Sequence, residues 1–292
     1  MRRSPASLRD LVAGVERKLR AARLHYGHGT ENARDEAAYL VLRGLRLAFE
    51  TPADTALTPS QVARVERLAE RRVRERIPVA YLLREAWLDD CPFYVDERVI
   101  IPRSHIAELL AAKLQPWLRS APRRVLDLCT GSGCLAILAA RAFPRAEVDA
   151  ADLSRGALAV ARRNVATYGL QGRVRLVRSD LFASLLRARY DLIVTNPPYV
   201  TRASMRALPR EYRHEPGMAL AGGADGLDLV RRIIEEAPAR LTPRGLLVCE
   251  IGSNRKALER AYPRLPFVWP GTVAGAGQVF LLPASALGKG MG

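Results

Sequence analysis

Residues 125–134 read VLDLCTGSGC, and this stretch decides the fold. Its apolar first half, residues 125–128, predicts a buried strand, while Gly131 and Gly133 predict a tight turn into a helix. Glycine lets a ligand approach the backbone closely, and the open amides at a helix start favour polar groups. Glycine turns also join strands to helices for packing reasons alone. The stretch by itself therefore leaves a binding loop and a structural turn both open.

Similar apolar runs recur toward the C-terminus, with helical patterns between most of them. Strands that alternate with helices predict an α/β fold with a mainly parallel sheet covered on both faces. The runs are residues 124–129, 146–151, 174–178, 190–195, 245–251 and 278–282.

The first part of the chain has helical periodicity instead. Apolar residues recur at helical spacing from Leu8 to Leu19, and Gly27 and Gly29 end that segment. A second helix is predicted over residues 32–49. Residues 58–61 read TPSQ, a capping box with proline in the first turn, and predict the start of a third helix.

Two short β-like runs, residues 93–95 and 99–101, flank the acidic pair Asp96 and Glu97 and predict a β-hairpin. We therefore predict three parts. They are a small all-helical domain over residues 1–85, a β-hairpin linker over residues 86–103, and an α/β domain over residues 104–292.

The composition is that of a folded protein with a strong positive charge. The formal net charge is +16 and the pI is near 10.5, which favours a polyanionic partner such as nucleic acid. Only four of the 46 basic residues are lysines, however, and such a bias also arises from genomic base composition. A functional basic face and a merely solvated one both remain open.

The chain shows no sign of a membrane, a leader or a metal. No apolar run approaches the roughly 20 residues that span a bilayer, and residues 1–12 lack a secretory core, so we expect a cytoplasmic protein. The histidines form no ligand set, and the cysteines lack metal-ligand spacing, so no metal is expected. The cysteines are expected to be buried thiols: Cys91, Cys129, Cys134 and Cys249.

Two acidic residues extend the glycine turn into a row of strand ends. Asp152 follows the second apolar run about 20 residues after the glycines, where an acid binds ribose hydroxyls in nucleotide-binding folds. It could instead cap the next helix, although Ser154 could supply that cap. Asp180 ends the third run in the same way. Ligands of open α/β sheets bind at this edge.

The details of this row favour one kind of ligand. The third glycine of the dinucleotide fingerprint and the P-loop lysine are missing, which argues against hydride transfer and nucleotide hydrolysis. A nucleoside with an amino-acid tail fits better. The Gly131 loop would take the tail, Asp152 the ribose, and Asp180 with Leu181 the adenine.

Residues 196–199 read NPPY directly after an apolar run. Pro197 and Pro198 have no N–H group, so the strand must end there. Their two rings stiffen the loop, and Asn196 is pushed to an extended conformation. The result is a rigid loop that presents an amide, unpaired carbonyls and the ring of Tyr199.

These motifs resemble those of class I S-adenosylmethionine-dependent methyltransferases, and NPPY resembles the motif of enzymes that methylate planar amide or amino nitrogens. Residues 93–104, FYVDERVIIPRS, and 211–216, EYRHEP, are similar to the PrmB family of ribosomal protein N(5)-glutamine methyltransferases. The similarity covers most of the chain. It implies a doubly wound, mostly parallel seven-stranded sheet, S-adenosylmethionine as cofactor, and N-terminal helices that recognise the substrate.

The resemblance implies methyl transfer to a glutamine of a large-subunit ribosomal protein (L three), either free or in an assembling subunit. Contact with ribosomal RNA through the basic surface is a further expectation. The expected catalytic residues are Asn196, Pro197 and Tyr199. The expected cofactor-binding residues are Asp127, Cys129, Thr130, Gly131, Ser132, Gly133, Asp152, Leu153, Asp180, Leu181 and Asn196.

The expected substrate-binding residues are Asn196, Pro197, Pro198 and Tyr199, with Arg103 and Glu215 as further candidates. A glutamine nitrogen is a poor nucleophile because its lone pair is delocalised. We expect the Asn196 side-chain oxygen and the Pro197 carbonyl to accept its two N–H groups, with Tyr199 against the amide plane. Arg103 could instead stabilise the linker or meet the cofactor carboxylate, and Glu215 could serve only as a surface ion-pair partner.

Three alternatives remain beside this reading. The release-factor glutamine methyltransferases (PrmC or HemK) share the IPR and NPPY elements but usually continue with Pro-Glu-Thr-Glu, whereas Arg103 is followed here by SHIAE. A DNA adenine methyltransferase fits less well because the first part is helical and no base-reading module is visible. A non-catalytic factor that binds ribosomal RNA should have lost the row of cofactor residues, which is complete here.

Overall fold

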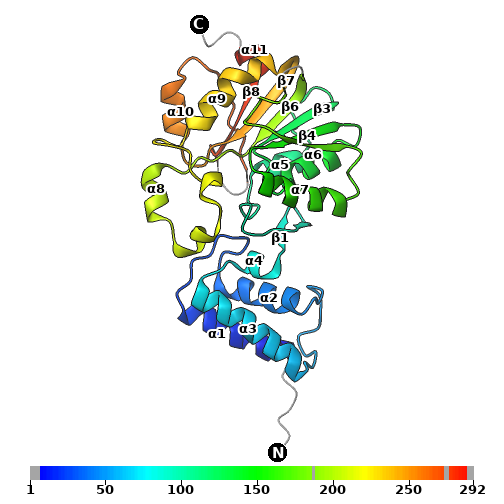
Figure 1. Cartoon of the computed structure of the whole chain (residues 1–292), viewed down its shortest axis with the longest axis vertical. Coiled ribbons are helices and arrows are strands. Elements are labelled where there is room, and N and C mark those ends of the chain that lie inside the picture. The colour runs from blue at the N-terminus through cyan, green and yellow to red at the C-terminus, as the bar shows by residue number, and fades with distance from the viewer. Residues whose placement is uncertain (1–6, 186–187, 273–275, 288–292) are drawn as a thin grey trace, which may run out of the picture.

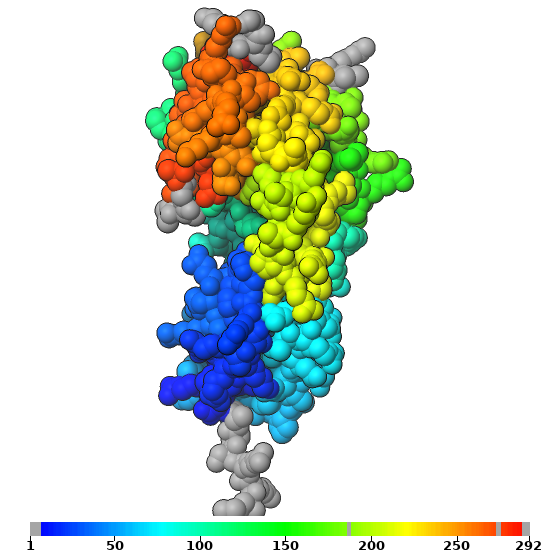
Figure 2. All heavy atoms as spheres, turned by 90° about the vertical axis from the view of Figure 1, so that its left-hand side faces the viewer, coloured from blue at the N-terminus to red at the C-terminus, as the bar shows by residue number. Residues whose placement is uncertain are grey.

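The computed structural model describes residues 7–185, 188–272 and 276–287 of the 292-residue chain. Two parts are stacked along the long axis of the molecule (Figure 1). Helices form the lower part, and a sheet with its covering helices forms the upper part. Figure 2 shows the yellow-green segment around residues 200–220 reaching from the upper part onto the lower one.

The lower part contains the predicted helices and one short additional helix. Thr58 and Gln61 form the predicted capping box, in which the Thr58 N–H donates to Gln61 Oε1 at 2.8 Å. The apolar faces meet in a core of their own, with Val15, Leu40 and Val65 fully buried. The helices are α1 (Leu8–Ala21), α2 (Ala33–Gly44), α3 (Pro59–Glu75) and α4 (Val79–Leu83).

The second helix ends at Gly44, so its predicted extension to residue 49 is wrong. Arg46 takes a left-handed φ of 60°, and the Leu47 N–H reaches back to the Leu42 carbonyl at 2.8 Å. A hydrogen bond of this span closes a helix C-terminus and turns the chain away.

A β-hairpin joins the two parts, but it lies earlier than predicted. Strands β1 (Ala86–Leu88) and β2 (Cys91–Phe93) pair antiparallel around Asp89 and Asp90, whose φ angles of 50° and 55° suit a two-residue hairpin turn. The predicted strands at 93–95 and 99–101 are therefore wrong. The Tyr94 N–H donates to the side chain of Asn164 and the Ile101 N–H to Glu215, so these amides are not available to a partner strand.

The upper part confirms the predicted α/β class with a mostly parallel sheet. The strand order is β5-β4-β3-β6-β7-β8, and only β8 runs antiparallel. Seven strands were expected, and the described residues form six. Next to β8, Val268 makes a single bridge to Leu281 where a seventh strand would lie. The strands are β3 (Arg124–Leu128), β4 (Glu147–Asp152), β5 (Val174–Arg178), β6 (Tyr190–Thr195), β7 (Leu241–Glu250) and β8 (Val279–Pro283).

Alternating residues of each strand pack on opposite faces of the sheet. Val125 and Leu192 face one core, while Leu126 and Ile193 face the other. The first face is covered by α5 (Ile106–Ala111), α6 (Cys134–Ala142) and α7 (Arg155–Thr167), and the second by α9 (Asp228–Glu236), α10 (Arg255–Ala261) and α11 (Ala284–Leu287). Throughout the ranges that the structure describes, no helix is long and apolar enough to cross a membrane.

The strand order reverses between β3 and β6, which pair side by side. β3 is followed in the chain by β4 on one side, whereas β6 continues to β7 on the other. A crevice at such a switch point is the usual ligand site of open α/β sheets. Both sequence motifs lie there, since residues 129–133 follow β3 and residues 196–199 follow β6.

Candidate active site

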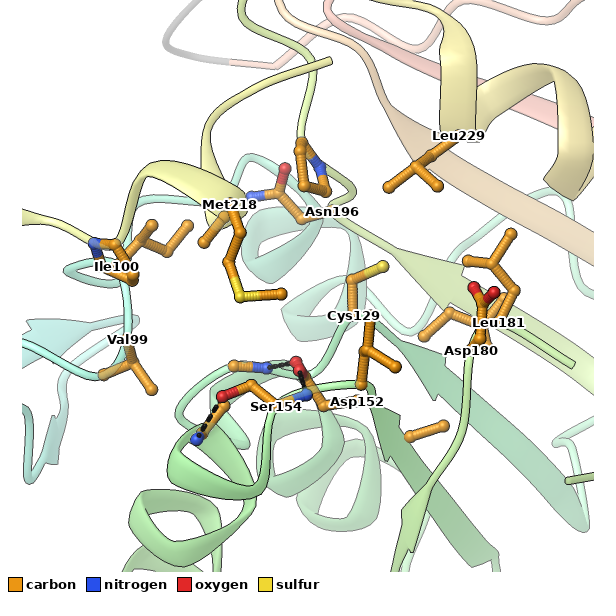
Figure 3. Close-up of a pocket in the computed structure, with 18 of the residues that line it drawn as sticks. Val99, Ile100, Cys129, Asp152, Ser154, Asp180, Leu181, Asn196, Met218 and Leu229 are labelled. Carbon is orange, nitrogen blue, oxygen red and sulfur yellow. Dashed lines mark hydrogen bonds between the residues drawn. The ribbon is translucent and has the colours of Figure 1, made fainter. Parts of the chain in front are cut away.

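A pocket opens at the carboxyl ends of the strands, at the switch point (Figure 3). It contains about 780 Å³ of empty space, counting the part open to solvent. Its lining brings together much of the predicted cofactor row, namely Cys129, Gly131, Asp152, Leu153, Asp180, Leu181 and Asn196. The other predicted members, Asp127, Thr130, Ser132 and Gly133, are not in the lining.

Asp127 lies wholly buried at the end of β3, beneath the glycine loop. Its Oδ2 accepts hydrogen bonds from the Thr130 hydroxyl at 2.5 Å and from the Ala136 N–H at 3.0 Å. Its Oδ1 has no hydrogen-bond partner among the described residues. Burial raises the pKa of Asp127 to about 7. The side chain therefore fastens the loop to the start of α6 and keeps one polar atom unsatisfied under the pocket.

The loop itself is held in a strained shape. Cys129 takes a φ of 57°, which is uncommon for a residue other than glycine. Gly133 has a φ of 80°, and a Cβ there would lie 3.1 Å from that of Ala161, so this glycine brings α6 close to α7. A Cβ on Gly131 would meet nothing within 4 Å. Gly131 therefore leaves open space beside the pocket, while Gly133 serves packing.

Asp152 closes the other side of the loop. Its two carboxylate oxygens accept from the Gly131 N–H at 2.9 Å and from the Ser154 N–H at 2.8 Å (Figure 3). The cap of α7 is supplied by Ser154, which accepts from the Ala157 N–H. Asp152 is thus free of the capping role, and its half-buried carboxylate lines the pocket with unused lone pairs.

Asp180 and Leu181 lie on the side of the pocket opposite Val99 and Ile100 in Figure 3. Asp180 is half exposed and pairs with Arg232 of α9 at 3.1 Å. Leu181 is buried, with a φ of 45°. This end of the pocket therefore combines an apolar wall with one partly neutralised acid.

Asn196 stands between two cavities. It lines the pocket described above, and also a second cavity with about 620 Å³ of empty space formed with Arg103, Pro197, Tyr199 and Tyr212. Its side chain makes no hydrogen bond with any residue that the structure describes. The Pro197 carbonyl likewise accepts none from those residues. The predicted free amide and free carbonyl are therefore found together, where the two cavities meet.

Tyr199 and the end of β7 fix the outer half of the loop. The Tyr199 hydroxyl donates to Glu250 Oε1 at 3.1 Å, and Glu250 Oε2 accepts from the Ser104 hydroxyl at 2.6 Å. The Tyr199 carbonyl accepts from the Asn254 side chain at 2.8 Å. The sequence analysis did not single out Glu250, because a lone acid at the end of an apolar run carries no motif.

The NPPY loop also depends on close backbone packing by Gly222. A Cβ at that position would lie 2.6 Å from Tyr199 Cα and 2.8 Å from the Pro198 carbonyl oxygen. We expect Gly222→Ala to lower the free energy of unfolding by about 1–3 kcal/mol and to reduce turnover, because the loop must move outward. Denaturant unfolding and an activity assay would measure both.

Gly172→Ala is the matched control, because a Cβ there meets nothing within 4 Å. It should leave both quantities close to wild type. Equal effects from the two substitutions would show that Gly222 does not hold the loop in place.

Arg103 and Glu215 form a buried ion pair rather than a surface one. Arg103 Nη1 and Nη2 donate to the two Glu215 oxygens at 2.5 and 2.7 Å, and Glu215 Oε1 also accepts from the Ile101 N–H at 2.9 Å. The Glu215 side chain is 0% exposed and does not line the second cavity. The expectation of a surface ion-pair partner is therefore wrong, and of this pair only Arg103 reaches the cavity.

Residues 210–219 connect this pair to the lower part of the molecule. The segment contains the short helices η1 (Arg210–His214) and η2 (Gly217–Ala219). The carboxylate of Glu211 accepts from the His25 N–H at 3.1 Å and pairs with Arg76. The centroid of the Tyr212 ring lies 4.4 Å from the centroid of the His28 ring. Burial lowers the pKa of His28 to about 4.

The first pocket is also lined by several residues that could not be identified from the sequence. Met218 is 57% exposed and extends into the pocket between Asn196 and Ser154 (Figure 3). Val99, Ile100 and Leu229 add apolar walls from the linker and α9. No local pattern marks such residues, because their place depends on how the linker and the 210–219 segment fold over the strand ends.

The cysteines are all free thiols, and Cys129 is the one that is half buried rather than buried. Among the described residues, no group of three or more His, Cys, Asp or Glu side chains is arranged to hold a metal ion.

Comparison with known proteins finds relatives that share about half of their residues with this chain over nearly its whole length. A protein named ribosomal protein uL3 glutamine methyltransferase from Bordetella pertussis is 56% identical, over 96% of each chain. A protein of the same name from Burkholderia pseudomallei is 53% identical, over 96% of this chain and 95% of the relative. Residues 106–209 match the family described as methyltransferase small domain.

A solved structure of the hMettl16 catalytic domain in complex with a 3′UTR hairpin shares the fold. The TM-score is 0.50 at 16% identity, over 77% of this chain and 81% of that one.

Proposed function

Since this chain belongs to the family of ribosomal protein uL3 glutamine methyltransferases, we propose that it methylates the side-chain amide nitrogen of a glutamine in uL3, with S-adenosylmethionine as donor. One observation carries the proposal for the site. Asn196, with an unpaired side chain, lines both the pocket at the strand ends and the second cavity. Donor and acceptor can therefore be bound in separate cavities and still meet at Asn196, beside the shared wall residues Ile100 and Ala219.

The first pocket fits S-adenosylmethionine. Gly131 leaves room for an amino-acid tail beside the loop. Asp152 has lone pairs to accept from ribose hydroxyls, although the Gly131 N–H is already bonded to it. Leu181 and Asp180 offer an apolar surface and an acceptor at the adenine end.

When bound, S-adenosylmethionine supplies an electrophilic methyl group. The Asn196 side-chain oxygen and the Pro197 carbonyl would accept the two N–H groups of the glutamine amide and so turn its nitrogen toward the first pocket. Neither acceptor is hydrogen-bonded to any described residue, and the rigid prolines keep both in place. Tyr199, held by Glu250, would pack against the amide plane.

Positioning supplies most of the acceleration in this mechanism. Effective molarity can contribute about 7 to 11 kcal/mol, whereas two neutral hydrogen bonds contribute about 0.5 to 1.5 kcal/mol each. No strong base is needed, because the nitrogen becomes acidic only as the new bond forms, and its proton can leave to water.

Asp152→Ala should raise the dissociation constant for S-adenosylmethionine by about tenfold or more, because a ligand hydroxyl and the Gly131 loop both lose an acceptor. Isothermal titration calorimetry would measure this dissociation constant. The control is Asp225→Ala, which removes an acid paired with Arg231 outside the pocket and should leave binding unchanged. Wild-type affinity in Asp152→Ala would remove this residue from the cofactor site.

The acceptor protein is tested by comparing methyl transfer to two candidate substrates in separate reactions. The purified chain is incubated with radiolabelled S-adenosylmethionine and either uL3 or a peptide chain release factor. We expect label in uL3, and mass spectrometry should place one added methylene unit on a single glutamine. Label in the release factor alone would overturn the proposed substrate and favour the sister family.

The proposal includes the setting of the reaction. uL3 would be met in the cytoplasm, either free or in an assembling large subunit, and the strongly basic chain would contact ribosomal RNA there. Methyl transfer to uL3 alone, compared with transfer to large-subunit particles from cells that lack the enzyme, distinguishes the two forms of substrate.

A further inference from the structure

An arginine-lined groove lies on the lower part, far from the pockets of the candidate active site. It contains about 1150 Å³ of empty space, counting the part open to solvent. One wall is a stripe of α3, where Arg64, Arg67 and Arg71 recur at helical spacing and so share a face. The other wall is formed by Arg43 and Arg46 at the end of α2, together with residues 82, 83 and 85.

The positive charge in this groove is only partly neutralised. Arg43 pairs with Glu85 at 2.7 Å, and Arg71 pairs with Glu75 at 3.2 Å. Arg46, Arg64 and Arg67 are exposed, and their side chains make no ion pair or hydrogen bond with the residues that the structure describes.

The acids of α3 do not offset these arginines. Glu66 pairs with Lys18 of α1, and Glu70 pairs with Arg74. Glu75 pairs with Arg74 as well as Arg71. The unpaired cations on the groove face of α3 therefore remain available to a polyanion.

An exposed aromatic ring adjoins the groove. Phe49 is 49% exposed, and Tyr39 and Trp87 support it with ring centroids 6.5 and 5.6 Å away. The Arg43 guanidinium lies 5.8 Å from the centroids of both Phe49 and Trp87. Because Arg43 also lines the groove, the ring and the arginines form one continuous surface.

We propose that this surface binds single-stranded RNA, with phosphates along Arg46, Arg64 and Arg67 and an unstacked base on Phe49. Arginines that follow a backbone beside a ring that stacks a base are the general means of binding single strands. An acidic peptide would use the arginines but would leave Phe49 without a partner. The proposal rests on the proposed function, because a ribosomal protein substrate brings ribosomal RNA to the enzyme.

The test measures binding of a fluorescent single-stranded RNA oligonucleotide to the full chain by anisotropy at several salt concentrations. In the variant Arg46→Ala/Arg64→Ala/Arg67→Ala, the slope of log K against log salt should become less steep by about 2, since each phosphate contact contributes about 0.7. Phe49→Ala should weaken binding by about fivefold or more at constant slope. Duplex RNA should bind more weakly than the single strand.

A matched control removes the same charge elsewhere. Arg119, Arg145 and Arg244 are exposed, lie on the upper part, and make no ion pair or hydrogen bond with the described residues. Their triple alanine variant should keep most of the affinity. Equal loss in both triple variants would mean that binding follows net charge, and the proposal would fail. It would also fail if the groove variant lost affinity for uL3 but not for RNA.

Methyl transfer by the wild-type chain to free uL3 is measured separately. Its absence would overturn the proposed function even if the RNA measurements came out as expected. If the chain methylates uL3 but the groove variants bind RNA as the wild type does, only the present inference would be overturned.

Discussion

Asn196→Ala should lower methyl transfer to uL3 by about a hundredfold or more, while the affinity for S-adenosylmethionine stays within a few-fold of wild type. A displacement of about 1 Å can cost that much when positioning supplies most of the acceleration. Without its side chain, only the Pro197 carbonyl would remain to orient the amide. Stability should hardly change, since the Asn196 side chain makes no hydrogen bond with the described residues.

Thr201→Ala is the control for the same loop. The Thr201 hydroxyl caps α8 (Arg202–Ala207) by accepting from the Ser204 N–H at 3.1 Å, and it lines neither cavity. Single-turnover transfer and calorimetric cofactor binding should be measured on both variants. If Asn196→Ala turned over at the wild-type rate, the amide would have no part in the mechanism.

Glu215→Ala should destabilise the fold by about 3–5 kcal/mol, which is the usual effect of removing one partner of a buried ion pair. Arg103 would be left without its bidentate partner and the Ile101 N–H without an acceptor. Chemical denaturation would report the change. A large loss of activity without loss of stability would instead place Glu215 in direct contact with the substrate.

The double variant Arg103→Met/Glu215→Leu tests whether the instability of Glu215→Ala comes from the arginine that is left without its partner. Replacing both charges by apolar groups removes the unpaired charge, so the double variant should be more stable than Glu215→Ala. Its transfer activity should nevertheless fall, because Arg103 lines the second cavity. If the double variant proved less stable than Glu215→Ala, desolvation of an unpaired arginine would not explain the loss of unfolding free energy in Glu215→Ala.

The strand-end row could be predicted because each member lies at the end of its strand or within three residues after it. Gly131, Asp152 and Asn196 need only the parallel sheet and the switch point to be brought together. The hairpin was misplaced because its position depends on distant partners. Asn164 and Glu215 take the amides of Tyr94 and Ile101, and nothing in residues 93–101 indicates this. The reach of Met218 into the pocket depends on the long-range fold in the same way.

The segment at residues 210–219 has a mechanical consequence. At one end Glu211 is tied to the helical base, and at the other Met218 enters the donor pocket. Fewer than ten residues separate these two points, so a short span of covalent chain joins the helical part of the molecule to the wall of the pocket at the strand ends.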